Sequence, residues 1–260
     1  MVGRLGAGDG GVVVPPPYSP AWDGKTVRNG AAIGKFSVEL AGRVASVLAG
    51  GRFPLVVGGD CSILIGNMLA LRRAGRYGLV FVDGHLDFRH QGNSPNVGAA
   101  AGEDLALVTG RGQESLANIE GRGPLVRDED VVAFAEREGD PETRDILETE
   151  ISVWDLAAVR SIGPAEAAAR AVGRFEDNGV DGFWVHLDAD VLDDAVMPSV
   201  DSRQPGGLGY AELIPALRVL LRSRLAVGMD VTIFDPDGDP TGEIAEGLLS
   251  ALEKAFEEDA

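Results

Sequence analysis

Residues 78–87 read GLVFVDGHLD, an almost wholly apolar run that leads directly into two aspartates and a histidine. A near-continuous apolar run is typical of a parallel strand that is buried on both faces. Residues 182–190 read GFWVHLDAD and repeat the pattern, with two more aspartates after a second apolar run. In open α/β sheets, ligands bind beyond the carboxyl ends of the strands. The two segments therefore predict a parallel sheet with an acidic site at one edge.

The rest of the chain alternates short apolar runs with longer amphipathic stretches, as repeated strand–helix–strand units do. Strands are predicted at Phe53–Val57, Gly78–Val82, Val131–Ala135, Ile151–Trp154, Gly182–Leu187 and Leu225–Val231. Helices are predicted at Phe36–Leu48, Cys61–Arg73, Leu105–Val108, Asp140–Glu148, Pro164–Phe175, Tyr210–Leu221 and Glu243–Phe256. Because no repeat or linker divides the chain, we expect residues 1–260 to form one domain with an irregular segment at 1–35. The predicted fold is α/β, a three-layer α/β/α sandwich around a mostly parallel sheet.

The composition limits the classes of partner. The 260 residues are enough for one large domain that needs no disulfide or structural metal to hold its core. The net charge is −18, from 41 acidic and 23 basic residues, which argues against nucleic acid and anionic membranes as partners. The single cysteine allows no intrachain disulfide, and no signal-peptide core or apolar run of about 18 residues is present. We expect a cytoplasmic protein that acts on a small molecule.

The two acidic clusters have the spacing of metal ligands. Alternate side chains of an extended segment point to one side, so Asp83, His85 and Asp87 can converge on one point. Asp188 and Asp190 share a face for the same reason. Carboxylates crowded beside apolar strands repel one another and lose hydration unless a cation compensates them. Carboxylate and imidazole ligands together suit Mn²⁺, Fe²⁺ or Zn²⁺.

A third predicted strand ends in the turn GGDCS at residues 58–62. Its two glycines permit a tight turn, and the first amides of the following helix would face the same edge of the sheet. A lone buried cysteine is usually a small hydrophobic residue. The position of Cys61 at a third strand end makes it a candidate ligand as well.

These three segments resemble the signatures of the ureohydrolase family, which includes arginases, agmatinases and formimidoylglutamases. The family's Gly-Gly-Asp-His-Ser turn corresponds to GGDCS at 58–62. Its Asp-Ala-His-x-Asp segment corresponds to DGHLD at 83–87, and its Ser-x-Asp-x-Asp-x-x-Asp-Pro segment to HLDADVLDD at 186–194. The resemblance extends over residues 50–258 and implies an arginase-like fold.

The resemblance also implies a dinuclear centre, usually of Mn²⁺, with Zn²⁺ or Fe²⁺ as alternatives. In this chain the ligands would be Asp83 and Asp188, which bridge both ions, Cys61 and Asp87 on one ion, and His85 and Asp190 on the other. A bridging hydroxide would attack a guanidinium or amidinium carbon, and the intermediate would release an amine. Family members are commonly trimers or hexamers, so a homo-oligomer is expected.

One departure from the family concerns Cys61, which stands where the family usually has a histidine ligand. A thiolate is softer and shifts the preference toward Zn²⁺ or Fe²⁺. A side branch that acts on N-hydroxylated guanidines resembles this chain in having cysteine here. Cys61 is therefore either a true ligand or a drifted position that leaves one ion only partly held.

Two further departures concern catalysis and substrate. The family's proton-shuttle histidine has no counterpart in AGED at residues 101–104, which leaves His90, Glu103 and Asp104 as alternatives. The more common role of two such carboxylates is as the N-cap and a first-turn residue of a helix. Arginase-like members hold the guanidinium with a glutamate near the end of the last strand, where this chain has Ile233.

Candidate substrate contacts lie beyond the metal motifs. Arg89 and Asn93 belong to the loop after residue 87, and Asp235 would substitute for the missing glutamate. Arg89 could bind a substrate carboxylate through two hydrogen bonds, and the alternative is an ordinary surface ion pair. His90 in the same loop is either a substrate contact or a solvated side chain.

The sequence thus favours a metal-dependent hydrolase that cleaves a C–N bond of a guanidino or amidino compound, with Asp83, Asp188, His90 and Glu103 as catalytic residues. One alternative is a catalytically degenerate family member that acts as a binding or structural subunit. Another is an amide hydrolase of the deacetylase kind. The family also has a strand before the region that corresponds to Val12–Pro17. Here that strand is expected to be missing, which leaves an open sheet edge, or truncated.

Overall fold

The computed structural model describes residues 3–137, 139 and 141–257 of the chain. One sheet runs through it, with the strands β1 (Leu55–Val57), β2 (Tyr77–Val82), β3 (Val131–Phe134), β4 (Ser152–Trp154), β5 (Gly182–Asp188) and β6 (Ala226–Thr232). Their order is β1-β6-β5-β2-β3-β4, and every neighbouring pair is parallel. The longest strands, β2, β5 and β6, lie in the middle of the sheet. The predicted parallel sheet is therefore confirmed.

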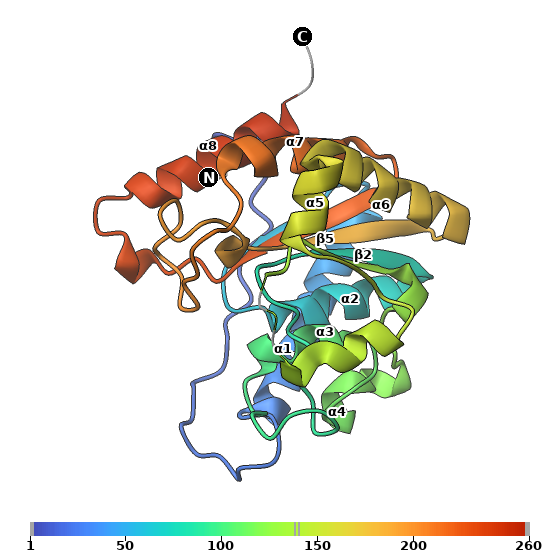
Figure 1. Cartoon of the computed structure of the whole chain (residues 1–260). Helices are drawn as coiled ribbons and strands as arrows, with labels where there is room; N and C mark the ends of the chain where they lie inside the picture. Colours follow the sequence, from blue (N-terminus) through green and yellow to red (C-terminus); the bar gives the residue numbers. More distant parts are fainter. Residues whose placement is uncertain (1–2, 138, 140, 258–260) are drawn as a thin grey trace.

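Helices cover both faces of the sheet (Figure 1). One face carries α1 (Gly30–Ala49), α2 (Ile63–Ala74), α3 (Asp104–Val108) and α4 (Glu114–Ala117), and the other carries α5 (Leu156–Ile162), α6 (Pro164–Asn178), α7 (Tyr210–Arg222) and α8 (Glu243–Phe256). Short 3₁₀ turns complete the chain: η1 (Ala100–Gly102), η2 (Ile119–Gly121), η3 (Asp128–Asp130), η4 (Pro141–Glu148), η5 (Ala189–Val191) and η6 (Pro236–Gly238). A separate apolar core fills the space on each side of the sheet, which confirms the three-layer sandwich.

The structure corrects several element predictions. Helix α1 begins at Gly30, so regular structure starts inside the segment that was expected to be irregular to residue 35. The predicted helix 140–148 is the 3₁₀ segment η4, and Asp140 lies outside the described residues. Helix α5 was not predicted, because its seven residues are too few for a clear amphipathic period. Its cap is visible in the sequence, since Asp155 accepts a hydrogen bond from the Ala158 amide at 2.7 Å.

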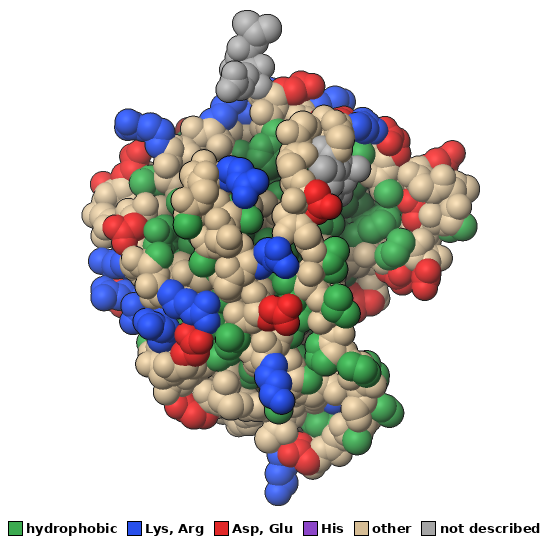
Figure 2. Space-filling model, turned by 180° about the vertical axis from the view of Figure 1, so that it is seen from behind, with side chains coloured by type: hydrophobic (Ala, Val, Ile, Leu, Met, Phe, Trp, Pro, Cys, Tyr) green, Lys and Arg blue, Asp and Glu red, His purple; other side chains and the backbone are tan. Residues whose placement is uncertain are grey.

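The first strand, β1, is an edge strand. It pairs only with β6, and among the described residues no strand precedes it. The open edge, helix α1 and the irregular segment 5–18 line a cavity of about 1080 Å³. Seen from behind, hydrophobic side chains gather around an indentation at one side of the molecule (Figure 2). None of the described helices has the length and apolar character that crossing a membrane requires.

The middle of the sheet has room for one large ring because a neighbouring residue has no side chain. Trp184 in β5 is fully buried and lies opposite Gly228 in β6. A Cβ atom at Gly228 would be only 2.0 Å from Cζ3 of Trp184. We expect Gly228→Ala to lower the free energy of unfolding by roughly 1–3 kcal/mol, because the ring must move within a closely packed core. Urea denaturation measures this change.

Gly173→Ala is the matched control for this prediction. Gly173 lies inside α6, and a Cβ there meets nothing within 4 Å. Alanine is the better helix former by about 0.5–1 kcal/mol, so this variant should be slightly more stable than the wild type. Equal stability of the Gly228→Ala variant and the wild type would contradict the packing argument.

Candidate metal centre

Three strand ends meet at the carboxyl edge of the sheet. The turn after β1 provides Cys61, the segment after β2 provides residues 83–87, and the end of β5 provides residues 188–190. Strands β2 and β5 are direct neighbours, with Val82 opposite Leu187. The chain continues from β2 to helices on one face and from β5 to α7 on the other. Such a switch in direction opens the crevice in which α/β proteins bind ligands.

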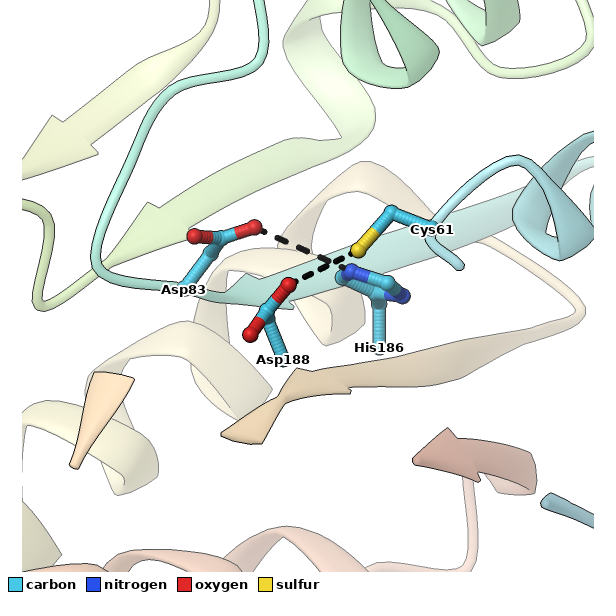
Figure 3. Close-up of side chains that lie close together, drawn as sticks. All are labelled: Cys61, Asp83, His186 and Asp188. Carbon is cyan, nitrogen blue, oxygen red and sulfur yellow. Dashed lines mark hydrogen bonds and ion pairs between the residues drawn. The ribbon is translucent and has the colours of Figure 1, made fainter. Parts of the chain in front are cut away.

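Four buried side chains form the first cluster, drawn in Figure 3. Its ligand atoms all lie within 4.8 Å of one another, and they belong to Cys61, Asp83, His186 and Asp188. The Cys61 thiol donates to Oδ2 of Asp188 at 2.8 Å and lies 3.1 Å from Oγ1 of Thr232. Nε2 of His186 lies 3.9 Å from Oδ2 of Asp83. A soft thiol, an imidazole and two carboxylates thus converge on one point.

A second cluster lies next to the first and contains Asp83, His85 and Asp190. Nδ1 of His85 is 2.9 Å from Oδ2 of Asp190, and the His85 amide donates to Oδ1 of Asp83 at 2.7 Å. Asp83 belongs to both clusters, so its two carboxylate oxygens face two neighbouring positions. That is the geometry of a bridging ligand.

The structure thus brings five of the six predicted ligands together, in two groups that share Asp83. Asp87 belongs to neither group, and its backbone has φ +44°. Burial and the nearby Asp83 raise its pKa well above the usual range, so Asp87 lies beside the centre and stays a predicted ligand. The sequence analysis missed His186. The alternation that pairs Asp188 with Asp190 also places His186 on the same side of the chain, and this signal could have identified it.

The electrostatics of the clusters favour a cation. Burial and the nearby Asp190 raise the pKa of Asp83 to about 6. Burial and Asp83 raise the pKa of Asp188 well above its usual range. Burial alone would lower the pKa of His85, but hydrogen bonds to Asp190 and Asp83 raise it to about 11. These shifts mean that the site holds more carboxylates than its own cationic groups can neutralise.

Two of the buried side-chain atoms that lack a hydrogen-bond partner face the first cluster. They are Oδ2 of Asp83 and Nε2 of His186. Buried polar atoms in native proteins are almost always paired, so unpaired ones at a cluster of ligand atoms indicate a missing ligand. The residues present therefore fit a divalent metal ion, which would be held by oxygen, nitrogen and sulfur donors.

The loop that carries Asp190 is held by Arg137. Its guanidinium donates to the carbonyl of Asp190 at 2.7 Å and to that of Gln204 at 3.2 Å. A Cβ atom at Gly84 would lie 2.3 Å from Nη1 of Arg137. Glycine at this position, where the resembled family has alanine, therefore makes room for the guanidinium.

The predicted residues in the loop after β2 have partners of their own. Nε2 of His90 is 3.1 Å from Oδ2 of Asp145, and its Nδ1 accepts from the Gly92 amide. The Asn93 amide group donates to Asp145 at 2.9 Å. Nε of Arg89 lies 3.8 Å from a carboxylate oxygen of Glu142, as in a surface ion pair. These contacts order the loop, and a role in binding substrate stays a prediction.

The other predicted carboxylates differ in their surroundings. Glu103 is buried and accepts a hydrogen bond from the Gly98 amide. Asp104 is fully buried, and burial and Asp83 raise its pKa well above the usual range, with a further contribution from Asp188. Asp235 is exposed and caps η6 by accepting from the Asp237 amide at 2.9 Å. Asp104 is therefore the one of these three that the charges of the centre affect.

Comparison with known proteins gives a consistent result. Residues 21–254 match the Arginase family. The arginase of Staphylococcus aureus strain COL is 29% identical over 236 residues, which cover 90% of this chain and 77% of that protein. The arginase of Bacillus caldovelox is 30% identical over 231 residues, 87% of this chain and 77% of that protein. Its native crystal structure superimposes with a TM-score of 0.87 at 27% identity and covers 95% of this chain and 83% of that chain.

The crowding of carboxylates gives a prediction about stability. Folding raises the pKa of Asp83 to about 6 from an ordinary value near 4, so the metal-free protein loses stability as the pH rises through this range. Asp83→Asn removes the charge and keeps the shape. We expect this variant, free of metal, to be more stable than the wild type by roughly 1–3 kcal/mol at pH 8 and equally stable at pH 4.

Chemical denaturation in the presence of a chelator tests this. Mn²⁺ should stabilise the wild type at pH 8 and have little effect on the Asp83→Asn variant. Asp193→Asn is the control, because amide hydrogen bonds from Ala195 and Gly206 lower the pKa of the half-buried Asp193. That variant should gain no stability. A loss of stability in metal-free Asp83→Asn at pH 8 would contradict the argument.

Proposed function

The chain belongs to the arginase family, and on this premise we propose that it is a metal-dependent hydrolase that cleaves a C–N bond of a small guanidino or amidino compound. The observation that supports this most strongly is the pair of clusters that share Asp83. Two adjacent cation positions with a common carboxylate are the arrangement used in two-metal hydrolysis.

The metal pair, when bound, supplies a hydroxide nucleophile at neutral pH and polarises the bond to be cleaved. We propose Mn²⁺ in this role, with Zn²⁺ or Fe²⁺ as the alternatives that Cys61 favours. The proposed ligands are Cys61, Asp83, His85, Asp87, Asp188 and Asp190, with Asp83 and Asp188 as the bridging pair. The carboxylates of the two clusters are buried away from bulk water, and their attraction to a cation is therefore stronger than it would be at the surface.

Proton transfer has three candidates in this chain. His90 and Glu103 stay predicted catalytic residues, each with a local hydrogen bond already in place. The structure adds support for Asp104, which is buried, has Oδ2 without a partner and interacts electrostatically with Asp83. A carboxyl group with a raised pKa can exchange a proton near neutral pH.

The substrate pocket lacks one expected charge. Ile233 occupies the position at which arginase-like proteins hold the guanidinium, and its side chain packs against the core on the α5–α8 face. No carboxylate from this position can pair with a cationic substrate. We therefore propose a substrate whose amidino group is less basic than that of arginine, such as an N-hydroxyguanidine or a formimidoyl compound. Arg89, Asn93 and Asp235 remain the proposed contacts to the rest of the substrate.

A substrate panel tests this proposal with the full-length protein loaded with Mn²⁺. Arginine, agmatine, Nω-hydroxyarginine and N-formimidoylglutamate would be incubated with it, and the amine products measured by mass spectrometry. We expect metal-dependent cleavage of at least one compound, with Nω-hydroxyarginine or N-formimidoylglutamate preferred over arginine. Asp188→Asn should lower kcat/KM by at least about 10³-fold, because a bridging carboxylate is lost.

Asp193→Asn serves as the control variant, since Asp193 belongs to neither cluster, and this variant should keep kcat/KM within about twofold of the wild type. A protein that binds two ions and cleaves none of the four compounds would contradict the proposed substrate class.

Two predictions from the sequence stay predictions: that the protein forms a homo-oligomer, a trimer or hexamer, and that it is cytoplasmic. Light scattering of the purified protein measures the oligomeric state.

A further inference from the structure

One buried histidine has no function in the ligand set that the resemblance implies. His186 lies within β5, is fully buried and is one of three histidines in the chain. Its Nδ1 has a hydrogen bond and its Nε2 has none. An imidazole nitrogen left unpaired in a protein interior is costly unless something else binds it.

The tautomer of this histidine is set by Asp230 in β6. Nδ1 of His186 lies 2.6 Å from Oδ1 of Asp230. The same carboxylate accepts from Nε1 of Trp184 at 2.6 Å and from Nδ2 of Asn67 at 2.7 Å. The carboxylate oxygens of Asp230 accept all three hydrogen bonds, so Nδ1 of His186 carries the hydrogen. The lone pair of the neutral ring is then on Nε2.

The direction of the ring is fixed as well. His186 stacks on Phe81 of the neighbouring strand, with the ring centroids 4.6 Å apart and the planes inclined by 18°. Its position two residues before Asp188 puts both side chains on the same side of β5. Nε2 therefore faces Cys61, Asp83 and Asp188, as the close-up shows (Figure 3).

We propose that Nε2 of His186 is a direct metal ligand and binds the same ion as Cys61, Asp83 and Asp188. The separation of 3.9 Å between Nε2 and Oδ2 of Asp83 is too long for a hydrogen bond. It fits two ligands of one ion, which lie roughly 3–4 Å apart when each is about 2.1 Å from the metal. A carboxylate that orients a metal-binding histidine through its other nitrogen is a common arrangement in metalloproteins. The inference rests on the proposed function insofar as a metal must occupy this cluster.

The proposal makes the two metal positions chemically different. A thiolate and an imidazole bind at the first position, whereas the second has His85 and carboxylates. The softer donor set favours Zn²⁺, Co²⁺ or Fe²⁺ at the first position, and the oxygen-rich set favours Mn²⁺ at the second.

Metal-binding measurements on full-length protein test the ligand. Equilibrium dialysis with Co²⁺, followed by elemental analysis, should give about two ions per wild-type chain. We expect His186→Ser to bind one ion at the original affinity and the other about 10–100-fold more weakly, or not at all. His90→Ser is the matched control, because His90 binds Asp145 and the Gly92 amide instead, and it should keep both ions.

A second variant tests whether the imidazole itself matters. In Cys61→His/His186→Ser the imidazole moves to the turn after β1, and two ions should again bind. A purely structural His186 would give the opposite pattern. His186→Ser would then lower the thermal stability and keep two ions at unchanged affinity, and that result would overturn the proposal.

If His186→Ser fails to fold, spectroscopy can test directly whether His186 binds the metal. In a His85→Asn/His90→Gln variant, His186 is the only histidine left, and it can be labelled with ¹⁵N. Electron–nuclear double resonance of one equivalent of bound Co²⁺, which the first position favours, should show a ¹⁵N hyperfine coupling from a directly bonded nitrogen. Bound Co²⁺ without this coupling would overturn the inference and leave the proposed function standing. A wild-type protein that binds no divalent ion would overturn both.

Discussion

The repulsion between buried carboxylates at the ends of β2 and β5 is the constraint on which the site depends. Asp83, Asp104, Asp188 and Asp190 are all almost completely buried at this edge of the sheet. Among the described residues, the imidazoles of His85 and His186 lie against these carboxylates, and burial opposes the protonation of both rings. A protein would not keep such a cluster for the sake of stability, because ionised carboxylates in a weakly polar interior are costly. A cation resolves the conflict, so the electrostatics and the family relationship support the same conclusion.

The sheet holds this cluster in place through its middle strands. Trp184, His186 and Asp188 lie on the same side of β5, and Asp230 of β6 connects the first two through its carboxylate. The ring of Trp184 fits there because residue 228 is glycine. The packing below the site and the orientation of its ligands are thus parts of one structure. A change in the packing around Trp184 would therefore alter the position of Nε2 of His186.

Much of the fold and of the site could be predicted from the sequence. The apolar runs that end in Asp83 and Asp188 identified the central strands and the edge that carries the ligands, because parallel strands buried on both faces have a simple composition. Residues whose importance arises from contacts between distant segments could not be recognised. His186 reads as part of an apolar strand, and its unpaired Nε2 and its bond to Asp230 exist only after β5 and β6 are aligned. The positive φ of Asp87 likewise shows that residues 83–87 do not follow the simple alternation of an extended segment, and nothing in the sequence predicts this turn.

The contact between Gly84 and Arg137 has a consequence for how this sequence can change over evolutionary time. The guanidinium occupies the volume that a methyl group at residue 84 would fill, and it also holds the loop of Asp190 by its carbonyls. A Cβ at residue 84 would also lie 2.9 Å from Oδ1 and 3.0 Å from the carbonyl oxygen of Asp190, so alanine there would displace both Arg137 and the loop that it holds. Residues 84, 137 and 190 are therefore in mutual contact, and the effects of substitutions at these positions should not be additive.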